Sequence, residues 1–170
     1  MISKKIFPFA IAAVVYGLMF TSYSCSVEKK TKSNGDSLLV SIQRYPCFGR
    51  CPYYDASLYE SGYILINRKG FMDNLGVYSS KATKEEMKEL IKEAERAGYQ
   101  SLPDSFYNPG IADYPATITR VNLNGKIKRV FDGEPEAPQS LKKFEETLHN
   151  FFTQKERNWQ LIRKKAGEED

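Results

Sequence analysis

Alternation of apolar and polar side chains along two stretches of this chain constrains its fold more than any other feature. Residues 38–44 place Leu38, Val40 and Ile42 on one side of the backbone, which is the two-residue period of a β-strand. Residues 54–59 alternate in the same way, residues 63–67 are apolar enough for a central strand, and residues 75–80 predict a short fourth strand. The first half of the chain therefore predicts a run of four consecutive strands.

A β-hairpin is the strongest local signal in the second half of the chain. Residues 117–123 and 126–131 are strand-like, and Asn124-Gly125 lies between them. This dipeptide suits the type I′ turn, whose backbone twist matches that of the flanking strands. We therefore predict two more strands here.

Two segments have the apolar spacing of amphipathic helices. Thr83 and Glu86 predict a capping box at the start of the first helix, and Gly98 predicts its end. Pro138 fits the first turn of the second helix. The apolar stripe of the second helix comprises Leu141, Phe144, Leu148, Phe151 and Phe152, and Trp159 and Ile162 extend it.

The predicted order is ββββαββα, with a proline-containing loop over residues 99–115. No strand-helix-strand alternation covers the chain, which disfavours a doubly wound parallel sheet. We expect an α+β fold, in which an antiparallel sheet of about six strands carries two helices packed on one face. We place this single domain at residues 37–162, followed by a polar tail at residues 163–170.

The N-terminal segment has the layout of a secretory signal. Two lysines precede an apolar run over residues 6–20, which is shorter than the roughly 20 residues that span a bilayer. Mostly small residues then lead to Cys25, and this stretch resembles a bacterial lipobox. The resemblance implies a signal peptide over residues 1–24 and a diacylglycerol on Cys25. The alternatives are a plain cleaved signal, with Cys25 incidental, and an uncleaved anchor.

A polar stretch follows Cys25. Val27 is the one apolar residue between positions 26 and 36, so this stretch buries too little surface to fold. We predict a flexible tether over residues 25–36, which spans on the order of 20 Å as a random coil. The expected location is the cell envelope, with the protein exported and lipid-anchored on the periplasmic or outer-membrane face.

Charge and residue counts exclude several function classes. The net charge of +4 falls to +2 if Lys4 and Lys5 leave with the signal, which is too small and too evenly spread for nucleic-acid binding. A single histidine excludes sites that need two histidine ligands. The chain also lacks a Walker loop, a nucleophile elbow and a zinc-protease motif.

The densest motif surrounds two cysteines, Cys47 and Cys51, with Gly49 between them and prolines on both outer sides. Export would bring both thiols into an oxidising compartment in many bacteria. Gly49 permits the tight turn that a disulfide needs. We predict a disulfide that fixes the connection between the first two strands and stabilises the fold by only about 2 kcal/mol.

The string Cys47-Phe48-Gly49-Arg50-Cys51-Pro52, followed by Tyr54, resembles the signature of a family of uncharacterised bacterial secreted proteins and lipoproteins. Asp113-Tyr114-Pro115 and Trp159 also resemble that family. The resemblance covers about residues 38–159. It implies an uncharacterised domain at the cell envelope, and it implies no mechanism.

Two functions compete for the cysteine loop besides a purely structural staple. As a binding loop, it would display a cation and aromatic rings, from Tyr45, Arg50, Tyr53 and Tyr54. As a thiol-redox or copper(I) site, it would use Cys47 and Cys51, with His149 as the third copper ligand.

Asp113, in the proline-bounded loop, is a further candidate for binding or for a general base. We expect a non-enzymatic module without a cofactor, which binds an envelope protein or glycan. Copper is the alternative cofactor.

Overall fold

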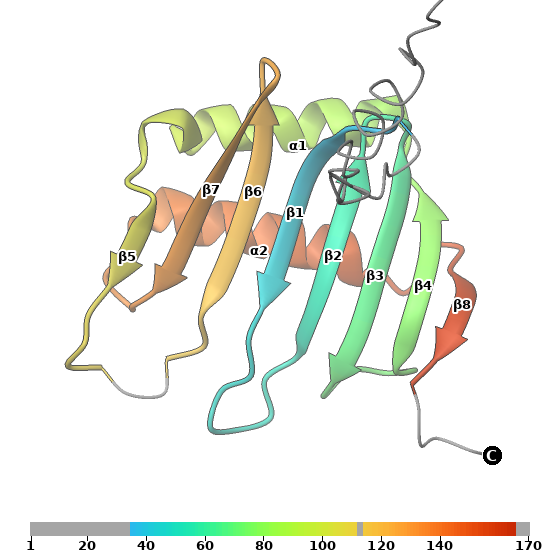
Figure 1. Ribbon diagram of the computed structural model, residues 1–170, viewed down its shortest axis with the longest axis horizontal. Coiled ribbons are helices and arrows are strands. Elements are labelled where there is room, and N and C mark those ends of the chain that lie inside the picture. The colour runs from blue at the N-terminus through green and yellow to red at the C-terminus, as the bar shows by residue number, and fades with distance from the viewer. Residues whose placement is uncertain (1–34, 112–113, 166–170) are drawn as a thin grey trace, which may run out of the picture. The chain divides into compact units, whose positions relative to one another are not determined.

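A computed structural model of the chain describes residues 35–111 and 114–165. Its centre is an eight-stranded sheet in the order β5-β7-β6-β1-β2-β3-β4-β8. The strands are β1 (Leu38–Arg44), β2 (Tyr53–Tyr59), β3 (Tyr63–Gly70), β4 (Gly76–Lys81), β5 (Ser105–Tyr107), β6 (Thr117–Leu123), β7 (Lys126–Gly133) and β8 (Gln160–Lys164). Helices α1 (Lys84–Arg96) and α2 (Gln139–Thr153) lie side by side on one face of this sheet (Figure 1).

The α+β class is confirmed, but the expected antiparallel sheet of about six strands is wrong. The described residues form eight strands, and β5 pairs parallel to β7, so the sheet is mixed. Strand β5 has only three residues, too few to show a period inside a proline-containing loop. Strand β8 is exposed along its whole length, so burial imposes no alternation on its sequence.

The end of α2 explains why β8 was missed. The helix stops at Thr153, and the chain then turns back along the edge of the sheet to pair with β4. Trp159 and Ile162 therefore do not extend the helix. Strand β8 also includes Arg163 and Lys164, two residues beyond the predicted end of the domain.

The core lies between the sheet and the two helices. Side chains that alternate along the central strands point toward the helices and are almost fully buried: Val40, Ile42, Ala56, Leu58, Ile64, Ile66, Val121 and Val130. They pack against Leu90, Ala94, Leu141, Phe144, Leu148 and Phe152 of the helices. Removing this apolar surface from water is the main force that holds the helices on the sheet.

The predicted turn and cap residues behave as expected. Thr83 and Glu86 form both hydrogen bonds of the capping box. Gly98, Asn124 and Gly125 have positive φ, as a helix end and a type I′ turn require. In the described part of the chain, no helix is long and apolar enough to cross a membrane.

Gly76 brings the last strand into the sheet. Its φ is +132°, and a Cβ at this position would lie 2.5 Å from the carbonyl oxygen of Arg163. Only glycine lets β4 and β8 approach at this point. Gly76 is also the cross-strand partner of Arg68 on β3, so no side chain from this position of β4 covers the Arg68 guanidinium.

Candidate functional site

The helix-facing side of the sheet changes from apolar to polar where β1 ends and β2 begins. Strand pairing aligns Asp132 with Thr117, Thr117 with Arg44, Arg44 with Tyr54, and Tyr54 with Arg68. We call these five residues the polar row. They occupy inward positions on the same strands that carry the core. Polar groups therefore lie under a helix here, at positions where the core pattern would place apolar side chains.

Helix α2 places polar side chains over this row. Lys142, Glu145 and His149 are three, four and seven residues apart, so they share one face of the helix. His149 lines two hollows, which meet at its side chain. One has a volume of about 310 Å³ and is lined by Arg44, Asp132, Lys142 and Glu145; we call it the Glu145 pocket. The other has a volume of about 630 Å³ and is lined by Arg68, Tyr78 and Trp159; we call it the Arg68 cleft.

Tyr54 and His149 join the sheet to the helix between the two hollows. The Tyr54 hydroxyl and Nδ1 of His149 are hydrogen-bonded at 2.9 Å. Burial raises the pKa of Tyr54 well above its usual range. Burial, and then the nearby Arg44 charge, lower the pKa of His149. Both side chains are therefore neutral at pH 7, and their hydrogen bond joins two uncharged groups.

Lys142 organises the Glu145 pocket. Its ammonium donates hydrogen bonds to the buried carboxylate of Asp132, to the Tyr114 hydroxyl at 2.6 Å and to the Glu134 carbonyl at 2.6 Å. Burial alone would lower the pKa of Lys142, but the hydrogen bonds to Asp132 and Tyr114 outweigh it and raise that pKa. The ammonium thus uses its three protons on three fixed acceptors.

Glu145 holds a proton in this pocket. Burial, and then the charge of Asp132 and a hydrogen bond to it, raise the pKa of Glu145 to about 9, although Lys142 and Arg44 act in the opposite direction. Its Oε1 atom is buried and has no hydrogen-bond partner among the described residues. Glu145 and Asp132 therefore form a carboxylic acid–carboxylate pair at neutral pH.

The Arg68 cleft is built around a stacked guanidinium. The Cζ atom of Arg68 lies 4.6 Å from the centre of the Tyr78 ring and 5.1 Å from that of Trp159. Trp159 is held in place because its Nε1 donates a hydrogen bond of 2.9 Å to the Gln154 carbonyl. The connection from α2 to β8 therefore supplies one wall of the cleft.

Arg157 ties the same connection to the first helix. Its guanidinium donates to Glu86 at 2.6 Å and to the Lys81 carbonyl at 3.0 Å, and it lies 4.5 Å from the centre of the Phe151 ring. These contacts fix the backbone immediately before Trp159. The cleft wall is thus anchored at both α1 and α2.

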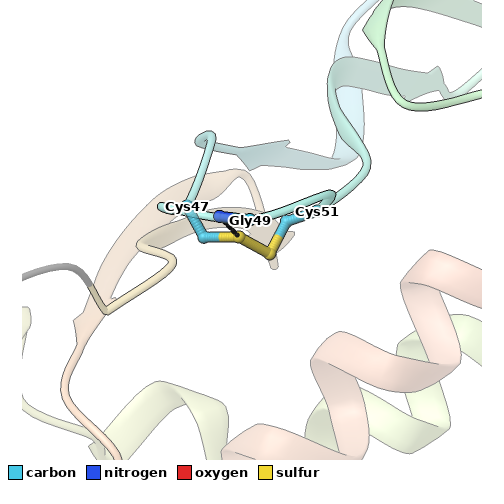
Figure 2. The surroundings of a disulfide bond; sticks show 3 residues. All are labelled: Cys47, Gly49 and Cys51. Atoms are coloured by element: carbon cyan, nitrogen blue, oxygen red, sulfur yellow. Dashed lines mark hydrogen bonds between the residues drawn. A yellow bond between two sulfur atoms is a disulfide. The ribbon is translucent and has the colours of Figure 1, made fainter.

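The cysteine loop lies beside the Arg68 cleft. The sulfurs of Cys47 and Cys51 are bonded to each other, with their Cα atoms 5.7 Å apart, and the Gly49 N–H donates to Sγ of Cys47 at 3.2 Å (Figure 2). Phe48 is 91% exposed at the tip of this loop. Pro52, directly after the staple, lines the cleft.

The structure separates the side chains expected to share one binding surface. Tyr45 and Arg50 are exposed, whereas Tyr53 is half-buried and its ring packs against Phe71 with centroids 6.3 Å apart. Tyr54 is fully buried beneath α2 and is not displayed on the loop. Cys25 and Asp113, two further predicted site residues, lie outside the described residues.

The sulfurs of Cys47 and Cys51, the copper ligands of the alternative prediction, are bonded to each other and so offer no thiolates in this state. The third ligand of that prediction, His149, shares its Nδ1 with Tyr54. Within residues 35–111 and 114–165, no three His, Cys, Asp or Glu side chains are grouped as metal ligands.

Sequence reasoning missed Arg44, Arg68, Lys142 and Glu145 as members of the site. The signal in the sequence was the position of these residues in the two-residue period of their strands. Arg44 and Arg68 come two residues after Ile42 and Ile66, so alternation assigns them to the buried face. Glu145 lies four residues after Leu141, beside the apolar stripe of α2. A charged side chain on the buried face of a strand or helix costs free energy unless it is paired, so charged residues at such positions indicate a polar site.

Replacing Glu145 tests the shared proton. Between about pH 4.5 and pH 9 the folded chain retains a proton that the unfolded chain releases, so the free energy of unfolding falls as pH rises through this window. In Glu145→Gln the amide donates permanently to Asp132. We expect the urea midpoint of the wild type to fall more than that of Glu145→Gln between pH 7 and pH 9.

Glu146→Gln is the matched control, because Glu146 is the exposed neighbour of Glu145 on the same helix. The lowered pKa of His149 keeps its folded-state titration below this pH range. Parallel pH profiles for the wild type and Glu145→Gln would show that Glu145 does not hold the proton.

Comparison with known proteins gives a family and no assigned activity. Residues 38–152 match the model of a domain of unknown function, DUF6438. No curated protein and no solved structure matches the chain. The match spans β1 to β7, α1 and all of α2 except Thr153, including the polar row and the Glu145 pocket, and it confirms that the domain is of an uncharacterised family. The chain therefore belongs to the DUF6438 family, whose function is unknown.

Proposed function

We propose that this protein is a membrane-tethered lipoprotein of the cell envelope, whose domain binds a ligand in the Arg68 cleft and catalyses no reaction. The observation that carries the proposal is the cleft itself, a hollow of about 630 Å³ between the sheet and the end of α2. Concave sites that combine apolar walls with fixed polar groups are the usual form of ligand sites. Tyr78 and Trp159 supply aromatic walls, and Arg68, Asp73, Lys155 and Arg157 supply charged groups.

The chemistry beside the cleft supports binding over catalysis. A nucleophilic site pairs a serine or cysteine with a base that can take its proton. Here Nδ1 of the one histidine is shared with the buried hydroxyl of Tyr54. The sulfurs of Cys47 and Cys51 are bonded to each other. These groups stabilise the walls of the cleft and provide no activated nucleophile.

The disulfide loop has a structural role in this proposal. It closes the connection between β1 and β2, and both strands contribute to the polar row. Pro52 and Tyr53 follow the staple directly, and Pro52 reaches the rim of the cleft. A fixed loop at the rim reduces the conformational freedom that a ligand would otherwise have to remove on binding.

The membrane tether rests on the N-terminal sequence. A basic start, an apolar run of about 15 residues and a cysteine directly after small residues support an exported chain with a lipid on Cys25. Two or more acyl chains hold a protein stably on a membrane. The polar residues 26–36 then separate the domain from the lipid surface.

Removing the lipidated residue tests the tether. In Cys25→Ala the thioether to the lipid cannot form, so we expect the protein to leave the membrane fraction after cell fractionation. Cys47→Ser/Cys51→Ser is the control, since it also removes cysteines and leaves the lipobox intact. Membrane retention of Cys25→Ala equal to that of the wild type would contradict the proposal.

A photocrosslinker placed in the cleft tests ligand binding in the cell envelope. Met72 lines the Arg68 cleft, so p-benzoylphenylalanine at position 72 should give adducts when intact cells are illuminated. Intact-protein mass measurement would detect both small and large adducts. Leu65 is also half-buried and lies on the opposite face of the sheet, so the same probe at position 65 is the control. Equal labelling at both positions, or none at position 72, would contradict the cleft as the binding site.

A further inference from the structure

We infer that the Arg68 cleft binds a singly charged carboxylate carried on an apolar or aromatic stem, with Arg68 as the group that recognises the anion. This inference rests on the proposed function and names the ligand class of that site. Four properties of the cleft carry it: a buried charge without a salt bridge, the planar fork of its N–H donors, the charge balance of the lining, and the apolar part of the walls.

Arg68 is a buried cation that forms no salt bridge with the described residues, although the Asp73 carboxylate is near enough to act on it electrostatically. It is only 9% exposed, and its Nε atom has no hydrogen-bond partner among the described residues. Its hydrogen bond to the described residues runs from Nη1 to the carbonyl oxygen of Asp73 at 3.4 Å. The Asp73 carboxylate instead pairs with Lys155 at 3.1 Å. A desolvated guanidinium with unused donors costs free energy that an anion in the cleft would offset.

Two aromatic rings lie against the guanidinium of Arg68. Tyr78 and Trp159 both lie within about 5 Å of its Cζ atom. Both contacts have the distance of a cation–π interaction. The guanidinium presents its N–H donors in one planar fork. A carboxylate offers two oxygens in one plane, which matches this arrangement.

The charges around the cleft balance except for one. Lys155 pairs with Asp73, and Arg157 pairs with Glu86 at 2.6 Å. His149 is neutral at pH 7, because burial and Arg44 lower its pKa. Arg68 is the positive charge left over among the cleft residues that the structure describes. One unpaired cation selects a singly charged group over a phosphate dianion.

The walls favour an apolar stem next to the carboxylate. Phe71, Met72, Tyr78 and Trp159 line the same hollow. Phe71 is half exposed at the rim, where it remains available to a ligand. A free organic acid and the carboxyl terminus of a peptide with an apolar last residue both carry this chemistry, so an experiment needs one probe for each source.

Trp159 supplies the readout, because it is the only tryptophan of the chain and it lies against Arg68. The purified full chain is titrated with 3-phenylpropionate for an organic acid, and with N-acetyl-phenylalanine for a peptide terminus, while Trp159 fluorescence is followed. The primary amide of each probe has the same stem without the charge. We expect the carboxylates to bind roughly 10- to 100-fold more tightly than their amides.

Arg68→Met removes the charge and keeps an unbranched side chain between the two rings. We expect it to lower carboxylate affinity roughly 10- to 100-fold and to leave amide affinity unchanged. Lys69→Met is the matched control: Lys69 is the next residue of β3 and pairs with Asp55. It should bind like the wild type. A circular dichroism spectrum of each variant checks that the fold is retained.

Each outcome of this experiment decides the inference. The peptide-terminus source is assigned if only N-acetyl-phenylalanine binds, and the organic-acid source if only 3-phenylpropionate binds. Equal binding of acids and amides would overturn recognition of the anion by Arg68, while a positive crosslink at position 72 would leave the binding function intact. Absence of binding by both acids, or stronger Arg68-dependent binding of inorganic phosphate, would also overturn the inference.

Discussion

The hydrogen bond between the Tyr54 hydroxyl and Nδ1 of His149 joins the sheet to α2 where their interface changes from apolar to polar. On one side of this bond, Leu148 and Phe152 pack on the central strands as ordinary core residues. Beyond this core, charged groups line the two hollows that share His149. Because both partners are neutral at pH 7, the bond links these regions without adding a further buried charge.

The two hollows balance their charges in different ways. In the Glu145 pocket, Lys142 pairs with Asp132 and Glu145 keeps its proton, so the charges of this pair balance within the chain, while Oε1 of Glu145 has no hydrogen-bond partner among the described residues. In the Arg68 cleft, the guanidinium lies against two aromatic rings and forms no salt bridge among the described residues. A satisfied polar network stabilises a fold, whereas an unpaired buried charge costs stability. This contrast supports the cleft, and not the pocket, as the proposed ligand site.

Much of the scaffold could be predicted from the sequence, because its signals are local. Alternation indicated β1 and β2, apolar character indicated β3, Thr83 and Glu86 indicated the start of α1, and Asn124-Gly125 indicated the β6–β7 turn. Strands β5 and β8 escaped prediction because pairing with distant strands, and not their own pattern, makes them strands. The polar row escaped for a related reason: its residues come from five different strands, and only the pairing register brings them together.

The cost of the unpaired charge is the most direct test of the central claim, that Arg68 is kept for a ligand and not for the fold. Urea unfolding of Arg68→Met and of the wild type, both without ligand, measures that cost. A methionine keeps the packing between Tyr78 and Trp159 and removes the desolvated charge, so the free energy of unfolding should be unchanged or higher in the variant. A variant less stable by more than about 1 kcal/mol, the size of a typical destabilising substitution, would show that Arg68 serves the fold and would contradict the claim.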